Sequence, residues 1–220
     1  MNAPSSSLLL RDIAYERIKD AIRTAEVHPG QPLTETGLSK TLGISRTPVR
    51  EALQMLSQEG LVQIIPGRAV TVAAPSINEV MDAIHIRYLL EPEVARLATK
   101  ALSEEQLETL REAVDGQEEA VAAGDRAAWS ATDNVFHATL SNACPNRLLG
   151  EISLQIRNRI SYLSVDVHDD ITGLATCTAE HRVILEKLAA GDADGAKNAM
   201  EHHIRMLRDS IFQRLMNHSY

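Results

Sequence analysis

Four side chains that can bind a metal are spaced in the sequence so that we expect them to lie close together in the folded protein. Asp133 and His137 are four residues apart, which places both on one face of a helix. His181 and His203 lie in two later segments, on the helix faces that also hold apolar residues. Three imidazoles and one carboxylate form a set that binds a borderline divalent metal and leaves coordination positions open. We therefore predict a metal site at Asp133, His137, His181 and His203.

One such histidine alone is more often a hydrogen-bonded core or surface residue than a ligand. Four such groups on inward faces are harder to explain in that way, because unpaired polar groups in an apolar core are costly. Zinc is the metal that we expect first, with nickel and manganese as alternatives. The other histidines are expected to have ordinary surface or structural roles; they are His28, His85, His168, His202 and His218.

Three arginines in the part of the chain after Pro75 could bind an anion. Arg87 precedes Glu91 by four residues, so the two can form an internal salt bridge. Alternatively, Arg87 faces the metal and holds a carboxylate through two parallel hydrogen bonds. Arg157 and Arg159 could line the same pocket, but we predict that they lie on the surface.

A second set of residues, near the N-terminus, has the chemistry of DNA recognition. Arg46 and Arg50 lie at i and i+4, outside an apolar stripe formed by Val49, Ala52, Leu53 and Leu56. Ser45 or Thr47 can cap this helix, and Pro48 is tolerated in its first turn. A short helix with guanidinium groups at its N-terminal end is suited to the major groove. We expect Ser45, Arg46, Thr47 and Arg50 to contact DNA.

The elements around this helix predict a winged helix-turn-helix. We expect helices over 8–25, 35–42 and about 46–59, with Gly43 in the left-handed conformation at the turn. The pattern then predicts two strands, over 61–65 and 69–72, joined by a turn at Pro66-Gly67-Arg68. This hairpin would place Arg68 over DNA phosphates or the minor groove.

The rest of the chain shows only helical periodicity after Ala73-Ala74-Pro75. Two capping boxes, Ser76–Glu79 and Ser103–Gln106, open the first two helices. Six helices are expected, over about 76–97, 103–123, 125–142, 146–166, 174–190 and 192–216, with Gly173 among the residues that separate them. The fold class is mainly α: residues 1–74 form the winged helix-turn-helix, and residues 75–220 form an antiparallel helical bundle.

Composition and charge restrict the partners. The net charge is −8, yet residues 1–74 contain eight Lys and Arg against seven Asp and Glu, so the acidic excess lies in the bundle. DNA contact is therefore expected only in the first domain.

No apolar run approaches the ~20 residues that span a bilayer, and Cys144 and Cys177 lie in apolar helical patterns. We expect a cytoplasmic protein with no membrane association and with reduced, buried cysteines.

The N-terminal residues resemble the DNA-binding domain of the GntR superfamily. The matching residues are Leu33–Glu35, Leu38–Leu53, Leu56, Glu59–Val62 and Pro66. Two positions differ from the family pattern. Thr36 stands where an arginine is common, and Ala69 stands where glycine usually follows the arginine of the wing. The resemblance therefore implies fewer DNA contacts here than in many relatives.

The bundle resembles the FCD ligand-binding domain of the FadR-type branch. In many FCD domains, the positions matching Asp133, His137, His181 and His203 are metal ligands, and the Arg87-x-x-x-Glu91 pattern favours the carboxylate-binding role of Arg87. The resemblance implies a transcriptional regulator, expected to be a repressor. It would bind a palindromic operator as a homodimer and respond to a small organic acid held by the metal and Arg87.

Two other hypotheses remain open at this stage. The open metal position could activate water in a hydrolase, although the sequence offers no obvious spare carboxylate as a base, and the DNA-binding domain would be unexplained. The metal could also be purely structural, with a fixed water completing its coordination. We predict that the protein is not an enzyme.

Overall fold

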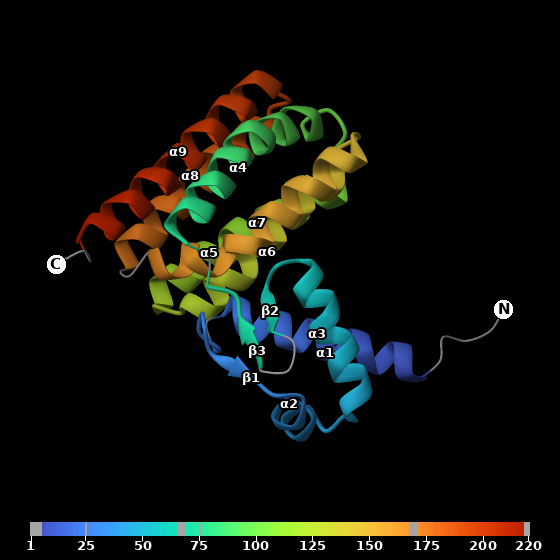
Figure 1. Cartoon of the computed structure of the whole chain (residues 1–220). Coiled ribbons are helices and arrows are strands. Elements are labelled where there is room, and N and C mark those ends of the chain that lie inside the picture. Colours follow the sequence, from blue (N-terminus) through green and yellow to red (C-terminus); the bar gives the residue numbers. More distant parts are fainter. Residues whose placement is uncertain (1–5, 25, 66–68, 75, 168–170, 218–220) are drawn as a thin grey trace. The chain divides into compact units, whose positions relative to one another are not determined.

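The computed structural model describes residues 6–24, 26–65, 69–74, 76–167 and 171–217. Within it the chain forms two compact units, Met1–Ser76 and Ile77–Tyr220. Each is described by itself below (Figure 1).

The described residues of the first unit form three helices and a small antiparallel sheet (Figure 1). Its elements are α1 (Ser6–Arg23), β1 (Pro32–Leu33), α2 (Glu35–Leu42), α3 (Arg46–Gln58), β2 (Val62–Ile65) and β3 (Ala69–Val72). The strand order is β1-β3-β2. The predicted winged helix-turn-helix is confirmed. The sequence did not indicate β1, because two residues are too few to show an alternating pattern. Arg68 and the tip of the hairpin lie outside the described residues.

Local interactions explain the turn between α2 and α3. The Thr34 side chain accepts a hydrogen bond from the Gly37 backbone and so caps α2. Gly43 ends that helix with φ of 68°, in the left-handed region where glycine has no Cβ penalty. Ser45 occupies the cap position of α3, and its side chain makes no capping hydrogen bond in the described structure. The buried stripe of α3 is formed by Pro48, Val49, Ala52, Leu53 and Leu56, and α3 packs against α1.

The second unit is a helical bundle of α4 (Ile77–Ala98), α5 (Glu104–Ala123), α6 (Arg126–Ala143), α7 (Arg147–Val167), α8 (Ile171–Ala189) and α9 (Ala193–Asn217) (Figure 1). The capping box between Ser103 and Gln106 is present in both directions, and Asp125 caps α6. The prediction that Gly173 lies between helices is wrong. Gly173 is inside α8, because glycine lowers helix propensity by only about 1 kcal/mol and does not prevent helix formation.

In the described part of the bundle, a large hydrophobic core contains residues of α4, α5, α6, α7, α8 and α9. Its largest side chains with almost no exposed area include Phe136, Leu140, Ile184 and Met200. Trp129 lies in a smaller adjacent cluster with Leu174 and Cys177, and its indole N–H donates to Thr178 Oγ1 at 2.9 Å. The three predicted metal-binding histidines lie on these buried faces, so the core positions them rigidly.

Gly150 allows α7 to approach α6 closely. A Cβ atom at this position would overlap the backbone carbonyl of Ser141, which cannot rotate away. We expect Gly150→Ala to lower the free energy of unfolding by at least about 1–3 kcal/mol. Gly116→Ala is the matched control in α5, since its Cβ would meet only the Thr132 side chain. Urea unfolding of both variants tests this, and equal stabilities would contradict it.

Candidate functional site

Three histidines from different helices converge in the bundle core. They are His137 of α6, His181 of α8 and His203 of α9, and each is at most 4% exposed. One ring nitrogen from each lies within 4.8 Å of the others. Metal–nitrogen bonds of about 2.0–2.1 Å would bring the three nitrogens closer together around one ion. The three side chains could therefore hold a single divalent ion.

Asp133 adds a carboxylate beside two of these rings. Its Oδ1 lies 3.6 Å from Nε2 of His137 and 3.8 Å from Nε2 of His181. Its Oδ2 is instead ion-paired with Arg157. One oxygen is thus directed at the histidines while the other is held by a cation. This is a suitable geometry for a monodentate ligand.

Two histidines have partners on the ring nitrogen that faces away from the centre. His181 Nδ1 lies 2.9 Å from Gln117 Oε1, and His203 Nδ1 lies 2.8 Å from Glu180 Oε2. Metal-binding histidines in proteins usually have such an outer acceptor, which fixes the ring and leaves Nε2 for the ion. Gln117 was not identified from the sequence. It was detectable as one polar residue on the apolar stripe of α5.

The protonation states suit metal ligation. Burial lowers the pKa of His137 to about 4, and the nearby Arg157 charge adds to the effect. Burial also places the pKa of His181 well below its usual value, with further contributions from His203 and His137. Both rings are therefore neutral at pH 7, and the neutral imidazole is the form that binds metals.

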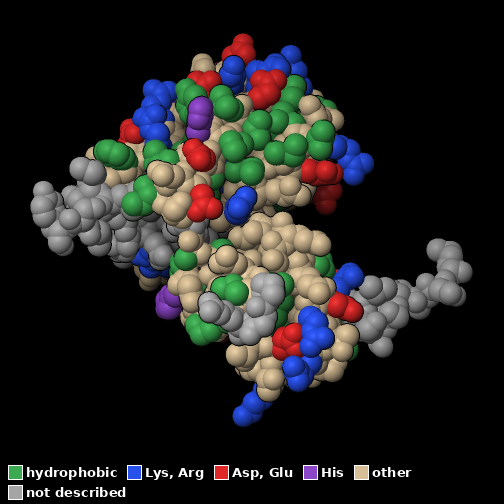
Figure 2. Space-filling model, in the orientation of Figure 1, with side chains coloured by type: hydrophobic (Ala, Val, Ile, Leu, Met, Phe, Trp, Pro, Cys, Tyr) green, Lys and Arg blue, Asp and Glu red, His purple; other side chains and the backbone are tan. Residues whose placement is uncertain are grey.

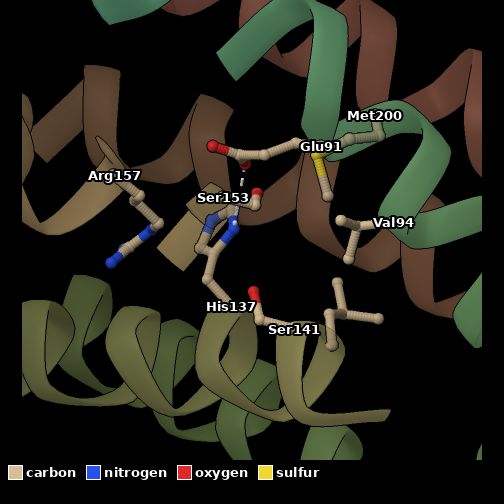
Figure 3. Close-up of a pocket in the computed structure, with 8 residues that line it drawn as sticks. Glu91, Val94, His137, Ser141, Ser153, Arg157 and Met200 are labelled. Atoms are coloured by element: carbon tan, nitrogen blue, oxygen red, sulfur yellow. Dashed lines mark ion pairs between the residues drawn. The ribbon is translucent and has the colours of Figure 1, made fainter. Parts of the chain in front are cut away.

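Arg87 and Glu91 form a buried ion pair next to this cluster. Arg87 donates from Nε and Nη2 to the two Glu91 oxygens, so the i,i+4 salt bridge is present. Glu91 Oε2 is also 3.4 Å from His137 Nδ1 (Figure 3). Burial raises the pKa of Glu91, but Arg87 and His137 outweigh it, and the net pKa is lowered. Glu91 is therefore ionised and links the arginine to the histidine cluster.

The prediction that Arg157 lies on the surface is wrong. Its side chain is buried, ion-paired with Asp133, and donates from Nη1 to Asn134 Oδ1 at 2.6 Å. The helical pattern did not reveal this, because a buried arginine needs partners from another helix and these are visible only in three dimensions. Arg159 is exposed, as predicted.

A small pocket opens beside His137. Its lining combines polar and apolar side chains from α4, α6, α7 and α9 (Figure 3); these are Glu91, Val94, His137, Leu140, Ser141, Ser153, Arg157 and Met200. Arg157 Nε is buried and has no hydrogen-bond partner among the described residues. A buried cationic donor without an acceptor favours a bound water or anion at this nitrogen.

An overlapping group could also bind an ion. It consists of Cys177, Glu180 and His203, whose ligand atoms lie within 4.8 Å of one another. We favour the three histidines with Asp133, since Glu180 already accepts a hydrogen bond from His203. Burial raises the pKa of the Cys177 thiol well above its usual value. Cys144 and Cys177 are both buried and free, as predicted.

The predicted DNA-contacting residues lie at one end of α3. Ser45, Arg46, Thr47 and Arg50 are all exposed. Arg46 and Arg50 are not isolated, because both bind the carboxylate of Glu35 on α2. Figure 2 shows basic and acidic side chains gathered in this region of the surface. The sequence alone did not indicate this contact between two helices.

Comparison with known proteins gives a consistent assignment for both units. Residues 10–72 match the family model of bacterial regulatory proteins of the gntR family, and residues 82–206 match the FCD domain. An HTH-type transcriptional regulator in the TAR-I ttuE-ttuC' intergenic region of Agrobacterium vitis is 35% identical over 58% of this chain and 76% of its own length. The HTH-type transcriptional repressor RspR of Escherichia coli is 28% identical, covering 90% of this chain and 87% of its own.

A solved structure has the same fold. The E. coli McbR/YncC structure superposes with a TM-score of 0.84 at 22% identity, over 94% of this chain and 98% of that one. The related proteins are transcription regulators rather than enzymes, which agrees with the prediction of no catalytic activity.

Proposed function

Because this chain belongs to the gntR family of bacterial regulatory proteins and contains an FCD domain, we propose that it is a metal-containing, acid-responsive transcriptional repressor. DNA binding and transcription regulation follow from the family. The finer proposal is supported chiefly by the three buried histidines whose ring nitrogens lie within 4.8 Å of one another in the FCD domain. We assign DNA contact to residues 1–74, and effector binding and dimerisation to residues 75–220.

The metal ligands in this proposal are Asp133, His137, His181 and His203. The neutral imidazoles of His137 and His181, one directed carboxylate oxygen and two outer acceptors suit zinc first, and nickel or manganese as alternatives. Such an ion supplies a Lewis-acidic position for an oxygen ligand. The chain supplies the surrounding charge and excludes bulk water from the buried rings.

The effector in this proposal is a small carboxylate. Arg87 holds Glu91 through Nε and Nη2, so its Nη1 is the group that we assign to an incoming carboxylate. Arg157 lines the pocket and offers an unsatisfied Nε, and we add it to the effector-binding residues. Ser141 and Ser153 provide hydroxyl groups in the lining of the same pocket. These donors favour an acid that also has a hydroxyl or a second oxygen acceptor.

A homodimer on a palindromic operator completes the proposal. The bundle exposes large apolar side chains of α4 and α7, namely Ile86, Leu89, Leu148 and Ile152. Figure 2 shows apolar surface over these two helices, which pack against each other. An apolar patch on an acidic domain favours association with a second copy over contact with DNA. Two α3 helices would then bind two half-sites.

The proposed location is the cytoplasm, where the operator would be. None of the described helices is both long and apolar enough to cross a membrane.

The test combines DNA selection with effector titration. Wild-type protein with zinc should select a preferred duplex from a random-sequence library, and one member of a panel of di- and tricarboxylates, sugar acids and hydroxy acids should weaken that complex. No preference over competitor DNA would refute the regulator. Sequence preference combined with no acid binding in calorimetry would support a purely structural metal.

Arg50 should contribute directly to base recognition. We expect Arg50→Ala to weaken binding to the selected duplex by about 1–3 kcal/mol, because a bidentate contact to guanine would be lost. Fluorescence anisotropy at fixed salt measures this. The control is Arg17→Ala, which removes the same charge from an exposed position of α1. If both variants lose affinity equally, Arg50 contributes only general charge.

A further inference from the structure

The carboxylate of Glu35 joins the two arginines assigned to DNA contact. Its Oε1 accepts a hydrogen bond from Arg50 Nε at 2.7 Å, and its Oε2 accepts one from Arg50 Nη2 at 2.9 Å. Oε2 also accepts a hydrogen bond from Arg46 Nη2 at 3.1 Å. Glu35 is the first residue of α2, and the arginines lie in the first two turns of α3. One carboxylate therefore binds both guanidinium groups through charge-assisted hydrogen bonds.

These bonds determine which edge of Arg50 remains available. The side edge, formed by Nε and Nη2, faces Glu35. The end edge, with Nη1 and the second Nη2 hydrogen, is left for another pair of acceptors. In the major groove, guanine presents O6 and N7 as such a pair. Because the side edge is held, Arg50 also loses less rotamer freedom when it binds a base.

The same contact changes the charge of this surface. The Arg46 and Arg50 side chains are 61% and 58% exposed, whereas Glu35 is 21% exposed. The hydrogen bond from Arg50 lowers the pKa of Glu35 to about 2, with Arg46 assisting, so the carboxylate is ionised at neutral pH. Two positive charges and one negative charge leave a balance of +1. Attraction to phosphates, which is common to all DNA sequences, depends on this balance.

We propose that Glu35 is a positioning residue for sequence recognition. It directs the end edge of Arg50 toward a guanine and cancels one charge that would otherwise strengthen binding to any DNA. The inference rests on the proposed function, since it requires that α3 contacts the operator. Its consequence is a larger affinity ratio between operator and random DNA than two unrestrained arginines would give.

Glu35→Gln tests this inference, because it removes the charge and keeps the shape. The probes are the duplex that the wild-type chain selects from a random-sequence library and a scrambled duplex of equal length. For scrambled DNA, we expect several-fold tighter binding and a salt dependence steeper by about 0.9, the value for one added phosphate contact. The affinity ratio should fall about tenfold, since base contacts are worth about 1–3 kcal/mol each. Glu35→Asp keeps the charge and should retain the wild-type salt dependence.

The matched control is Glu16→Gln on α1. Glu16 is exposed, and its substitution changes the net charge equally without touching the Glu35 cluster. Its affinity ratio should stay at the wild-type value. If the wild-type chain selects a sequence but Glu35→Gln leaves the ratio unchanged, the inference fails alone. If the wild-type chain selects no sequence, the proposed function fails and the inference fails with it.

Discussion

His181→Ala should weaken metal binding by on the order of a hundredfold or more. Loss of an outer partner alone typically costs about 10–100-fold in affinity, and loss of a ligand should exceed that. His181 is central in the cluster, with its ring stacked on Phe136 and its Nε2 close to Asp133. Competition with a coloured chelator measures the affinity for zinc, and elemental analysis gives the metal content after purification.

The control for this variant is His202→Ala. His202 precedes His203 directly but is exposed on the outer side of α9, so its loss should leave metal affinity unchanged. Circular dichroism of the metal-free proteins checks that both variants are folded. Wild-type affinity in a folded His181→Ala protein would contradict the proposed site. Equal losses in both variants would show that binding depends on surface histidines.

Arg157→Ala should lower the free energy of unfolding of the metal-free protein by about 3–5 kcal/mol. Removing one partner from a buried ion pair leaves the other charge without compensation. Here the uncompensated group is the carboxylate of Asp133, which is 7% exposed. Zinc should restore part of the loss, because Asp133 would then lie beside a cation again. Urea unfolding with and without zinc measures both effects.

Arg159→Ala is the control on the same helix. Arg159 is exposed, so its substitution should change stability by no more than about 0.5 kcal/mol. Similar losses in the two variants would contradict the buried pairing of Arg157. If zinc does not reduce the loss of unfolding free energy in Arg157→Ala, Asp133 is not a ligand of the metal.

Local patterns were sufficient to predict most of the fold. Helical periodicity and turn residues identified the helix-turn-helix, the hairpin and six bundle helices, because each depends on interactions within a few residues. Gly43 shows this directly, since its left-handed φ of 68° is a local requirement at the end of α2. The short strand β1 was missed because its pairing with β3 joins residues distant in sequence. The predicted start of α8 was wrong because a helix tolerates the glycine at position 173.

The candidate site likewise has features that the sequence predicted and features that only the tertiary structure showed. The spacing of Asp133 and His137, and the inward faces of His181 and His203, could be inferred from sequence because each depends on the phase of one helix. What only the tertiary structure decided was the pairing between helices. It placed Arg157 against Asp133, Gln117 against His181, and Glu35 between Arg46 and Arg50. The periodicity of one helix determines which face a side chain lies on. The residue that this side chain contacts on another helix depends on how the helices pack together.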